Sequence, residues 1–156
     1  MLFRIPGRCL LTAILLCGAP VPLRAGPAEL AALEQPADAE ALRARADALS
    51  AQLRAAPGDA VLYPRRGETW FRLHEFERAI EDFTRAIALD RSQDDAWYGR
   101  GMAYGRNGEV QKGIDDLGVY IERNPKNSPA YTKRGVRYLW LGDLDHAGAD
   151  LRRAIA

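Results

Sequence analysis

Three aspartates recur at one constant spacing, and carboxylates that converge could bind a metal ion or carry out acid–base chemistry. They are Asp82, Asp116 and Asp150. The constant spacing, however, assigns the three carboxylates to separate, parallel helices, where they do not converge on one site. We therefore expect them to lie on a solvated face of the protein, near Arg85, Arg152 and Arg153.

The remaining residues with reactive side chains are few. The chain has two histidines and two cysteines. We expect His74 to lie at a turn and His146 to lie at the start of a helix, both exposed to solvent. No group of side chains has the spacing of a metal site, a phosphate-binding loop or a nucleophile with its base. The sequence therefore predicts a protein that is not an enzyme, with no cofactor and no metal ion.

The N-terminal segment, residues 1–25, has the features of a secretory signal peptide. Arg4 and Arg8 precede an apolar run at residues 9–17, and Ala25 is a small residue at a cleavage position. The apolar run is too short to span a bilayer, which takes about 20 apolar residues. We expect cleavage after Ala25, no stable membrane span in the mature chain, and export to the periplasm.

The mature chain would be slightly acidic. Three of the 22 basic residues (Arg4, Arg8 and Arg24) leave with the signal peptide, so 22 − 3 = 19 basic residues remain against 21 acidic ones. Both cysteines, Cys9 and Cys17, also leave with it, so the mature chain can form no disulfide. A net charge of −2 provides no overall positive field for nucleic acid, and we expect no nucleic-acid partner.

After the signal peptide, apolar periodicity and turn residues predict a linker and then helices only. The linker covers residues 26–38, a first helix lies within residues 39–57, and three helical hairpins follow at residues 60–93, 94–127 and 128–156. We expect the turns within the hairpins near His74, Asn107 and Gly142. No run alternates with the period of two that a strand requires, so the fold class is all-α.

The hairpins share the spacing of the three aspartates at several more positions. The repeated sets are Gly67, Gly101 and Gly135; Tyr63, Trp97 and Tyr131; Trp70, Tyr104 and Tyr138; Phe83, Leu117 and Leu151; and Arg66, Arg100 and Arg134. Glycine within a helix costs about 1 kcal/mol relative to alanine, so glycines in register indicate close helix packing. We expect Gly101 to face the helix that carries Gly113, and Gly105 to tolerate alanine better. We also expect Gly113 to make room for Tyr120.

A period of about 34 residues with this spacing of aromatic residues and glycine resembles the tetratricopeptide repeat (TPR) family. The resemblance covers residues 60–156 and implies a right-handed α-solenoid of three hairpins that binds a protein or peptide partner. Pro57 falls where a repeat-closing proline would. The helix before it is therefore interpreted as an N-terminal capping helix, the second half of a degenerate repeat.

The family resemblance also implies a ligand-binding groove on the concave side, formed by the first helices of the hairpins. The matching residues are Arg65, Glu68 and Arg72 in the first hairpin, Tyr98, Met102 and Arg106 in the second, and Lys133, Val136 and Trp140 in the third. Such a surface suits a segment with acidic and apolar residues. The alternative is that Tyr98 and Trp140 only pack at helix edges while the charged side chains are solvated.

Some family members hold a C-terminal carboxylate with a set of lysines and asparagines. At those positions this chain has Pro64, Glu68, Gly99, Pro129 and Lys133, of which only Lys133 is basic. We therefore do not expect that type of carboxylate clamp here.

The most direct functional interpretation is an exported adaptor or scaffold in a cell-envelope assembly. One alternative is a permanent structural subunit that docks, or forms a homo-oligomer, through its C-terminal end, where Leu144, Leu151 and Ile155 would be partly uncovered. Another is a non-catalytic companion that regulates an enzyme. The sequence leaves these alternatives open.

Overall fold

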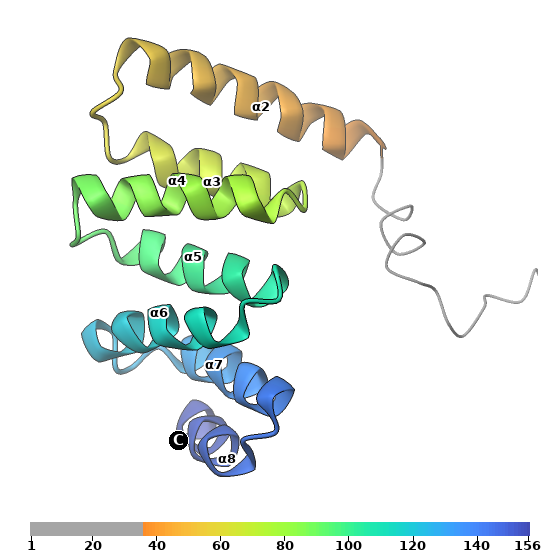
Figure 1. The fold of residues 1–156 in the computed structure, drawn as a ribbon, viewed down its shortest axis with the longest axis vertical. Helices are drawn as coiled ribbons and strands as arrows, with labels where there is room; N and C mark the ends of the chain where they lie inside the picture. Colours follow the sequence, from red (N-terminus) through yellow and green to blue (C-terminus); the bar gives the residue numbers. More distant parts are fainter. Residues whose placement is uncertain (1–35) are drawn as a thin grey trace, which may run out of the picture. The chain divides into compact units, whose positions relative to one another are not determined.

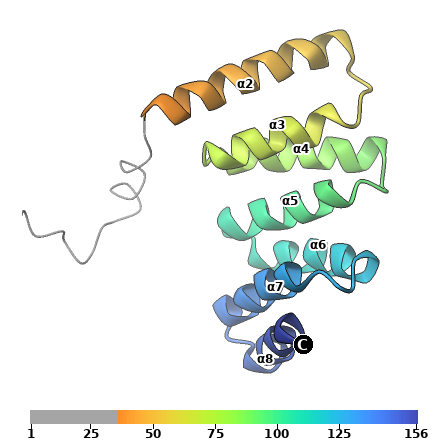
Figure 2. The same cartoon turned by 180° about the vertical axis from the view of Figure 1, so that it is seen from behind.

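The computed structural model describes residues 36–156, and this part of the chain is entirely helical (Figure 1). Its helices are α2 (Pro36–Ala55), α3 (Leu62–Arg72), α4 (Phe76–Leu89), α5 (Asp94–Arg106), α6 (Val110–Arg123), α7 (Ser128–Leu141) and α8 (Leu144–Ile155). They pack in chain order as a solenoid (Figures 1 and 2). The predicted all-α fold class is therefore confirmed.

The predicted hairpins correspond to the pairs α3–α4, α5–α6 and α7–α8, and their turns fall where the sequence placed them. The first helix begins earlier than expected, at Pro36 instead of residue 39, so residues 36–38 are helical and do not belong to a linker. Proline is tolerated in the first turn of a helix, and Asp38 favours the positive end of the helix dipole there. The signal peptide and the rest of the predicted linker lie outside the described residues.

The first helices of neighbouring hairpins lie closer together than the second helices. Each helix packs on the next, and α3 also contacts α5, while α5 contacts α7. Among the described residues, no comparable contact joins α4 to α6 or α6 to α8. The described stack therefore has α3, α5 and α7 on its inner side, as a groove formed by first helices requires (Figure 2).

Close packing within the hairpins explains the repeated glycines. A Cβ placed on Gly101 would lie 3.1 Å from the carbonyl oxygen of Gly113, and one placed on Gly113 would lie 2.8 Å from that of Gly101. Gly101 thus faces the helix that carries Gly113, as predicted. Gly113, however, makes room for the backbone of α5 and not for Tyr120. Phe83 and Leu117 fill the space between hairpins, at 3% and 0% exposure.

The expectation of a solvated aspartate face is wrong. Asp82, Asp116 and Asp150 are buried, at 4%, 6% and 5% exposure, and each is paired with an arginine of its own hairpin. The pairs are Arg66–Asp82, Arg100–Asp116 and Arg134–Asp150, each with two hydrogen bonds of 2.7–2.9 Å. Hydrogen bonding to Asp82 raises the pKa of Arg66, and hydrogen bonding to Asp150 likewise raises the pKa of Arg134.

The arginine–aspartate pairing follows from the geometry of the hairpin. Each arginine lies 16 residues before its aspartate, which places the two residues opposite each other across the hairpin. The bonds form a parallel fork, the strongest arrangement of an arginine with a carboxylate. The repeated aspartates are therefore structural, and they hold the two helices of each hairpin in one register.

The same arginines also connect neighbouring hairpins. Arg100 donates a hydrogen bond of 3.2 Å from Nη1 to Thr84 on α4, and Arg66 donates one of 3.0 Å from Nη1 to Ser50 on α2. Ser50 and Thr84 are separated by one period of the repeat, as Arg66 and Arg100 are. The helix α2 therefore provides a hydroxyl acceptor to the arginine of α3, as α4 does to the arginine of α5. This fits the interpretation of α2 as the second half of a degenerate repeat.

A repeated hydrogen bond fixes the start of each first helix. The polar atoms of Tyr63, Trp97 and Tyr131 donate to the backbone carbonyls of Pro57, Arg91 and Pro125, at 2.9, 3.0 and 3.3 Å. Each acceptor lies six residues before its donor, in the turn that precedes the hairpin. The aromatic ring can therefore be buried while its polar atom satisfies an unpaired turn carbonyl.

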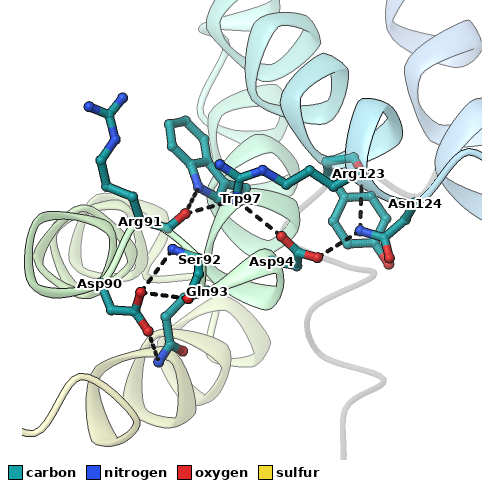
Figure 3. A network of polar contacts seen from close by, with 9 residues as sticks. Asp90, Arg91, Ser92, Gln93, Asp94, Trp97, Arg123 and Asn124 are labelled. Atoms are coloured by element: carbon teal, nitrogen blue, oxygen red, sulfur yellow. Dashed lines mark hydrogen bonds and ion pairs between the residues drawn. The ribbon is translucent and has the colours of Figure 1, made fainter.

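The junction between the first two hairpins carries an additional polar network (Figure 3). Arg123, at the end of α6, donates from Nη1 to the carbonyl of Arg91 at 2.7 Å and to Oδ1 of Asp94 at 3.1 Å. Asn124 donates to Oδ2 of Asp94 at 2.9 Å. The guanidinium of Arg123 also lies 5.8 Å from the ring centroid of Trp97. These contacts join the end of α6 to the start of α5 and hold α5 in position at the groove.

Candidate peptide-binding groove

A pocket of about 530 Å³ lies between α3 and α5 on the inner side of the stack. Its lining residues come mainly from these two helices and are Pro64, Arg65, Glu68, Phe71, Arg72, Phe83, Asp95, Tyr98, Gly99 and Met102. The structure therefore brings together the predicted residues Arg65, Glu68, Arg72, Tyr98 and Met102. The other predicted residues, Arg106, Lys133, Val136 and Trp140, lie outside this pocket on α5 and α7.

The apolar floor of the pocket was not predicted. It includes Phe71 from α3 and Phe83, which reaches the pocket from α4. A Cβ on Gly99 would lie 2.4 Å from the ring of Phe83, so a glycine is needed here for that ring to be accommodated. One signal in the sequence could have shown this. The first and third hairpins have Arg65 and Lys133 at one repeat position. The second hairpin has a glycine, Gly99, at the same position.

The charges in the pocket are balanced. Arg65 and Arg72 are exposed, but Glu68 and Asp95 line the same pocket. Within the described residues, none of these four side chains forms an ion pair. The charged rim is therefore available to a ligand, while the excess of positive charge lies further along the groove.

Tyr98 both packs against another helix and lines the pocket, whereas the sequence analysis treated packing and ligand binding as alternatives. Its ring packs against Tyr120, with 5.0 Å between the centroids, and it also lines the pocket. Burial raises the pKa of Tyr98, and the nearby charge of Arg137 opposes that effect. Trp140, by contrast, is 53% exposed, with the guanidinium of Arg137 5.8 Å from its ring centroid. Both rings therefore remain available to a ligand.

The positive end of the groove contains an arginine that the sequence analysis missed. Arg137 on α7 is only 2% exposed. It donates from Nη1 to the carbonyl of Lys133 at 2.7 Å, and from Nη2 to the carbonyl and Sδ of Met102 at 3.3 and 3.2 Å. Its Nε is buried without a partner, and no carboxylate of the described residues pairs with it. Burial lowers the pKa of Arg137, and the charge of Arg106 acts in the same direction.

Two substitutions within the repeat pattern reveal Arg137 in the sequence. The equivalent positions in the other hairpins hold Thr69 and Ala103, so a long side chain replaces a small one. In compensation, Gly105 stands where the other hairpins have Phe71 and Leu139. A Cβ on Gly105 would lie 2.4 Å from Nε of Arg137, so alanine there requires this side chain to shift, whereas a side chain on Gly101 meets the backbone of Gly113.

The described residues contain no group of three or more histidines, cysteines or acidic residues that could hold a metal ion. His146 is exposed at the start of α8, as predicted, where it pairs with Asp143 at 2.7 Å and stacks on Tyr138. His74 lies at the predicted turn and is also exposed. Of the helices described, none combines the length and apolar character needed to cross a membrane.

Comparison with known proteins gives consistent results. The TPR repeat family model matches residues 67–108. Heat shock protein STI1 of Saccharomyces cerevisiae is 29% identical over 94 residues, which cover 60% of this chain but only 16% of that protein. The chain thus matches about a sixth of the length of this curated relative.

Solved structures share the fold. A crystal structure of MamA is 29% identical with a TM-score of 0.68, covering 70% of this chain and 64% of that one. The second TPR domain of Spaghetti (RPAP3), solved with the HSP90 peptide SRMEEVD, is 29% identical with a TM-score of 0.59, covering 68% and 96%. YrrB, a TPR protein with an unusual peptide-binding site, has a TM-score of 0.70 at 22% identity, covering 74% and 60%, and shows the fold alone.

The repeated glycines, the arginine–aspartate pairs and the aromatic contacts to the turns recur with one period, and the comparisons agree with that period. The chain folds as a TPR-like solenoid and is similar to TPR repeat proteins.

Proposed function

We propose that this protein is an exported adaptor whose inner groove binds a segment of a partner protein. The observation that carries the proposal is the pocket between α3 and α5, which combines an apolar floor with a charged rim that lacks ion pairs. Tyrosine, tryptophan and arginine are the residue types enriched at binding hot spots, and the groove presents all three. Spaghetti (RPAP3), which holds an HSP90 peptide, supports the proposal as a relative of similar fold.

The groove favours a segment that contains both apolar and acidic residues. An apolar side chain suits the floor formed by Phe71 and Phe83. Acidic residues suit the end of the groove near Arg106, Lys133 and Arg137, where no carboxylate of the described residues balances the charge. In such a complex, long-range charge mainly sets the association rate, and the buried aromatic contacts slow dissociation.

The double substitution Arg72→Glu with Arg106→Glu is expected to weaken binding most at low salt, where screening is least. The probe is a peptide selected from a random library on the full-length protein, and the measurement is binding kinetics at several salt concentrations. The substitution Trp140→Ala is expected to raise the dissociation rate by an amount equivalent to about 2 kcal/mol, with little change in salt dependence.

Arg85→Glu with Arg152→Glu provides a matched control. These arginines are exposed on the second helices α4 and α8, outside the groove, and the double substitution changes the net charge by the same amount. The control should retain most of the affinity. If the groove variants fold and bind the peptide as the wild type does, the groove is not the binding site.

Export to the periplasm and a role in an envelope assembly are part of the same proposal. They rest on the basic residues Arg4 and Arg8, the apolar run at residues 9–17 and the small residue Ala25. N-terminal sequencing of the protein purified from cells is expected to begin at Gly26. An unprocessed chain in the cytosol would remove the export proposal and leave the groove proposal unaffected.

A structural subunit is the second candidate, and the exposure of α8 favours it. Leu144 and Ile155 are 70% and 86% exposed on this helix, and Leu151 is partly buried. Under this alternative a second copy of the chain would associate through α8. Leu144→Ser with Ile155→Ser would then abolish association in sedimentation experiments, while the groove substitutions would have no effect. The third alternative, a non-catalytic companion that regulates an enzyme, is a form of the groove proposal in which the enzyme is the partner.

A further inference from the structure

The surroundings of the Arg137 charge differ from those of the repeated arginines. Arg66, Arg100 and Arg134 each make a two-bond pair with an aspartate. Arg137 is more deeply buried than any of them, yet its partners are two backbone carbonyls and a thioether, all of them neutral. Burying a charge without a counter-charge costs several kcal/mol, so this arrangement requires an explanation.

The helices around Arg137 are adapted to accommodate it. Gly105 and Gly113 both lie against its Nε, and a Cβ on either would come within 2.4 Å and 3.2 Å of that atom. Glycine within a helix costs about 1 kcal/mol relative to alanine. Gly113 already has a backbone reason to be glycine, but Gly105 meets only Arg137, so a helix glycine and an uncompensated charge occur together at this point of the groove.

Met102 separates the guanidinium from the groove. Its Sδ accepts from Nη2 of Arg137 at 3.2 Å, and its side chain also lines the pocket between α3 and α5. Sulfur is a weak acceptor, and an unbranched methionine side chain changes rotamer easily. A stronger acceptor that arrives from the groove can therefore displace the thioether without a change in the backbone.

The charges around this point all favour an anion. Arg106 is near enough to Arg137 to lower its pKa, and Lys133 is one helical turn before Arg137 on α7. Tyr98 provides a phenol on the same side. Asp95 and Glu68 belong to the pocket between α3 and α5, and neither forms an ion pair with Arg137. Two exposed cations thus surround a buried one.

We propose that Arg137 is the receptor for a carboxylate of the bound segment, which displaces the thioether of Met102 and accepts a hydrogen bond from Nη2 of the guanidinium. This proposal rests on the proposed function, because it assumes that the groove binds a segment. It adds a specific requirement to the ligand: an acidic group placed so that a neighbouring apolar side chain enters the pocket between α3 and α5. The carboxylate belongs either to an acidic side chain or to a C-terminus.

The test uses the peptide selected from a random library on the full-length protein. Three versions are compared: the parent peptide, the same peptide with its Asp or Glu replaced by Asn or Gln, and the same peptide with an amidated C-terminus. Against the wild type, one of the two changes is expected to weaken binding by about tenfold or more, as for the loss of a hydrogen bond to a charged group. Which change does so identifies the source of the carboxylate.

Against Arg137→Met the same change in the peptide is expected to have almost no effect, because the receptor is already absent. Arg106→Gln is the matched control, since it removes a neighbouring exposed charge, and most of the tenfold difference should persist. Selective labelling of the methionine methyl groups gives an independent measurement. The resonance of Met102, assigned with Met102→Leu, should shift with the parent peptide and not with the neutral version.

The results separate the two proposals. If the neutral peptide loses as much affinity for Arg137→Met as for the wild type, the carboxylate is recognised elsewhere, and the groove function stands without this receptor. If neither neutral version loses affinity, Arg137 is not a receptor. If the library yields no peptide, both proposals fail. Should Arg137→Met not fold, Arg137→Lys replaces it, because it retains the charge but lacks the guanidinium that places a donor beside Met102.

Discussion

The substitution Asp116→Ala is expected to lower the free energy of unfolding by about 3–5 kcal/mol, the typical effect of breaking a buried ion pair by removing one partner. The Asp116 side chain is 8% exposed and that of Arg100 is 14% exposed, so the arginine would be left with little access to water. The loss also removes two hydrogen bonds that join α5 to α6, of 2.7 and 2.9 Å. Urea denaturation followed by circular dichroism measures the change.

Asp115→Ala is the matched control, because Asp115 is the neighbouring residue on the same helix and is exposed. It should change the free energy of unfolding by less than about 0.5 kcal/mol, as for most surface substitutions. The double variant Arg100→Met with Asp116→Leu should recover most of the loss, because it leaves no unpaired charge. Equal stability of Asp116→Ala and Asp115→Ala would contradict the structural role assigned to the repeated aspartates.

These pairs show where sequence-based reasoning failed. The period identified both Arg100 and Asp116 as repeated residues, but a period alone does not state which repeated residues face each other. Pairing requires the register between the two helices of a hairpin, and a separation of 16 residues places the pair opposite each other. The fold itself was predictable because it depends on small and aromatic residues whose spacing is visible in the chain.

The groove was predictable in part for a related reason. Residues on the first helices, such as Arg72 and Tyr98, follow from the repeat frame alone. Phe83 enters the pocket from a second helix because Gly99 leaves space for its ring, and this depends on a contact between two hairpins. Arg137 depends in the same way on Gly105. Departures from the repeat, and not the repeat itself, carry the information that is specific to this protein.

Replacing a glycine by a larger residue is expected to have opposite effects on stability at two positions of the chain. Gly101→Leu is expected to lower the free energy of unfolding by about 1–3 kcal/mol or more. The first added carbon already lies 3.1 Å from the carbonyl oxygen of Gly113, and the rest of the side chain would overlap Leu117. A backbone oxygen cannot turn aside as a side chain can, so α5 and α6 would have to separate.

Gly118→Ala, on α6, is expected to raise the free energy of unfolding by up to about 1 kcal/mol, the gain in helix propensity. A Cβ there would meet only Nη1 of Arg134, at 3.7 Å, which is an ordinary contact. Thermal and urea denaturation of both variants measure the two effects. If Gly118→Ala were as destabilising as Gly101→Leu, close approach of the helices would not be what distinguishes the repeated glycines. If Gly101→Leu were neutral, the register of α5 against α6 would be wrong, and with it the positions of Tyr98 and Met102 in the groove.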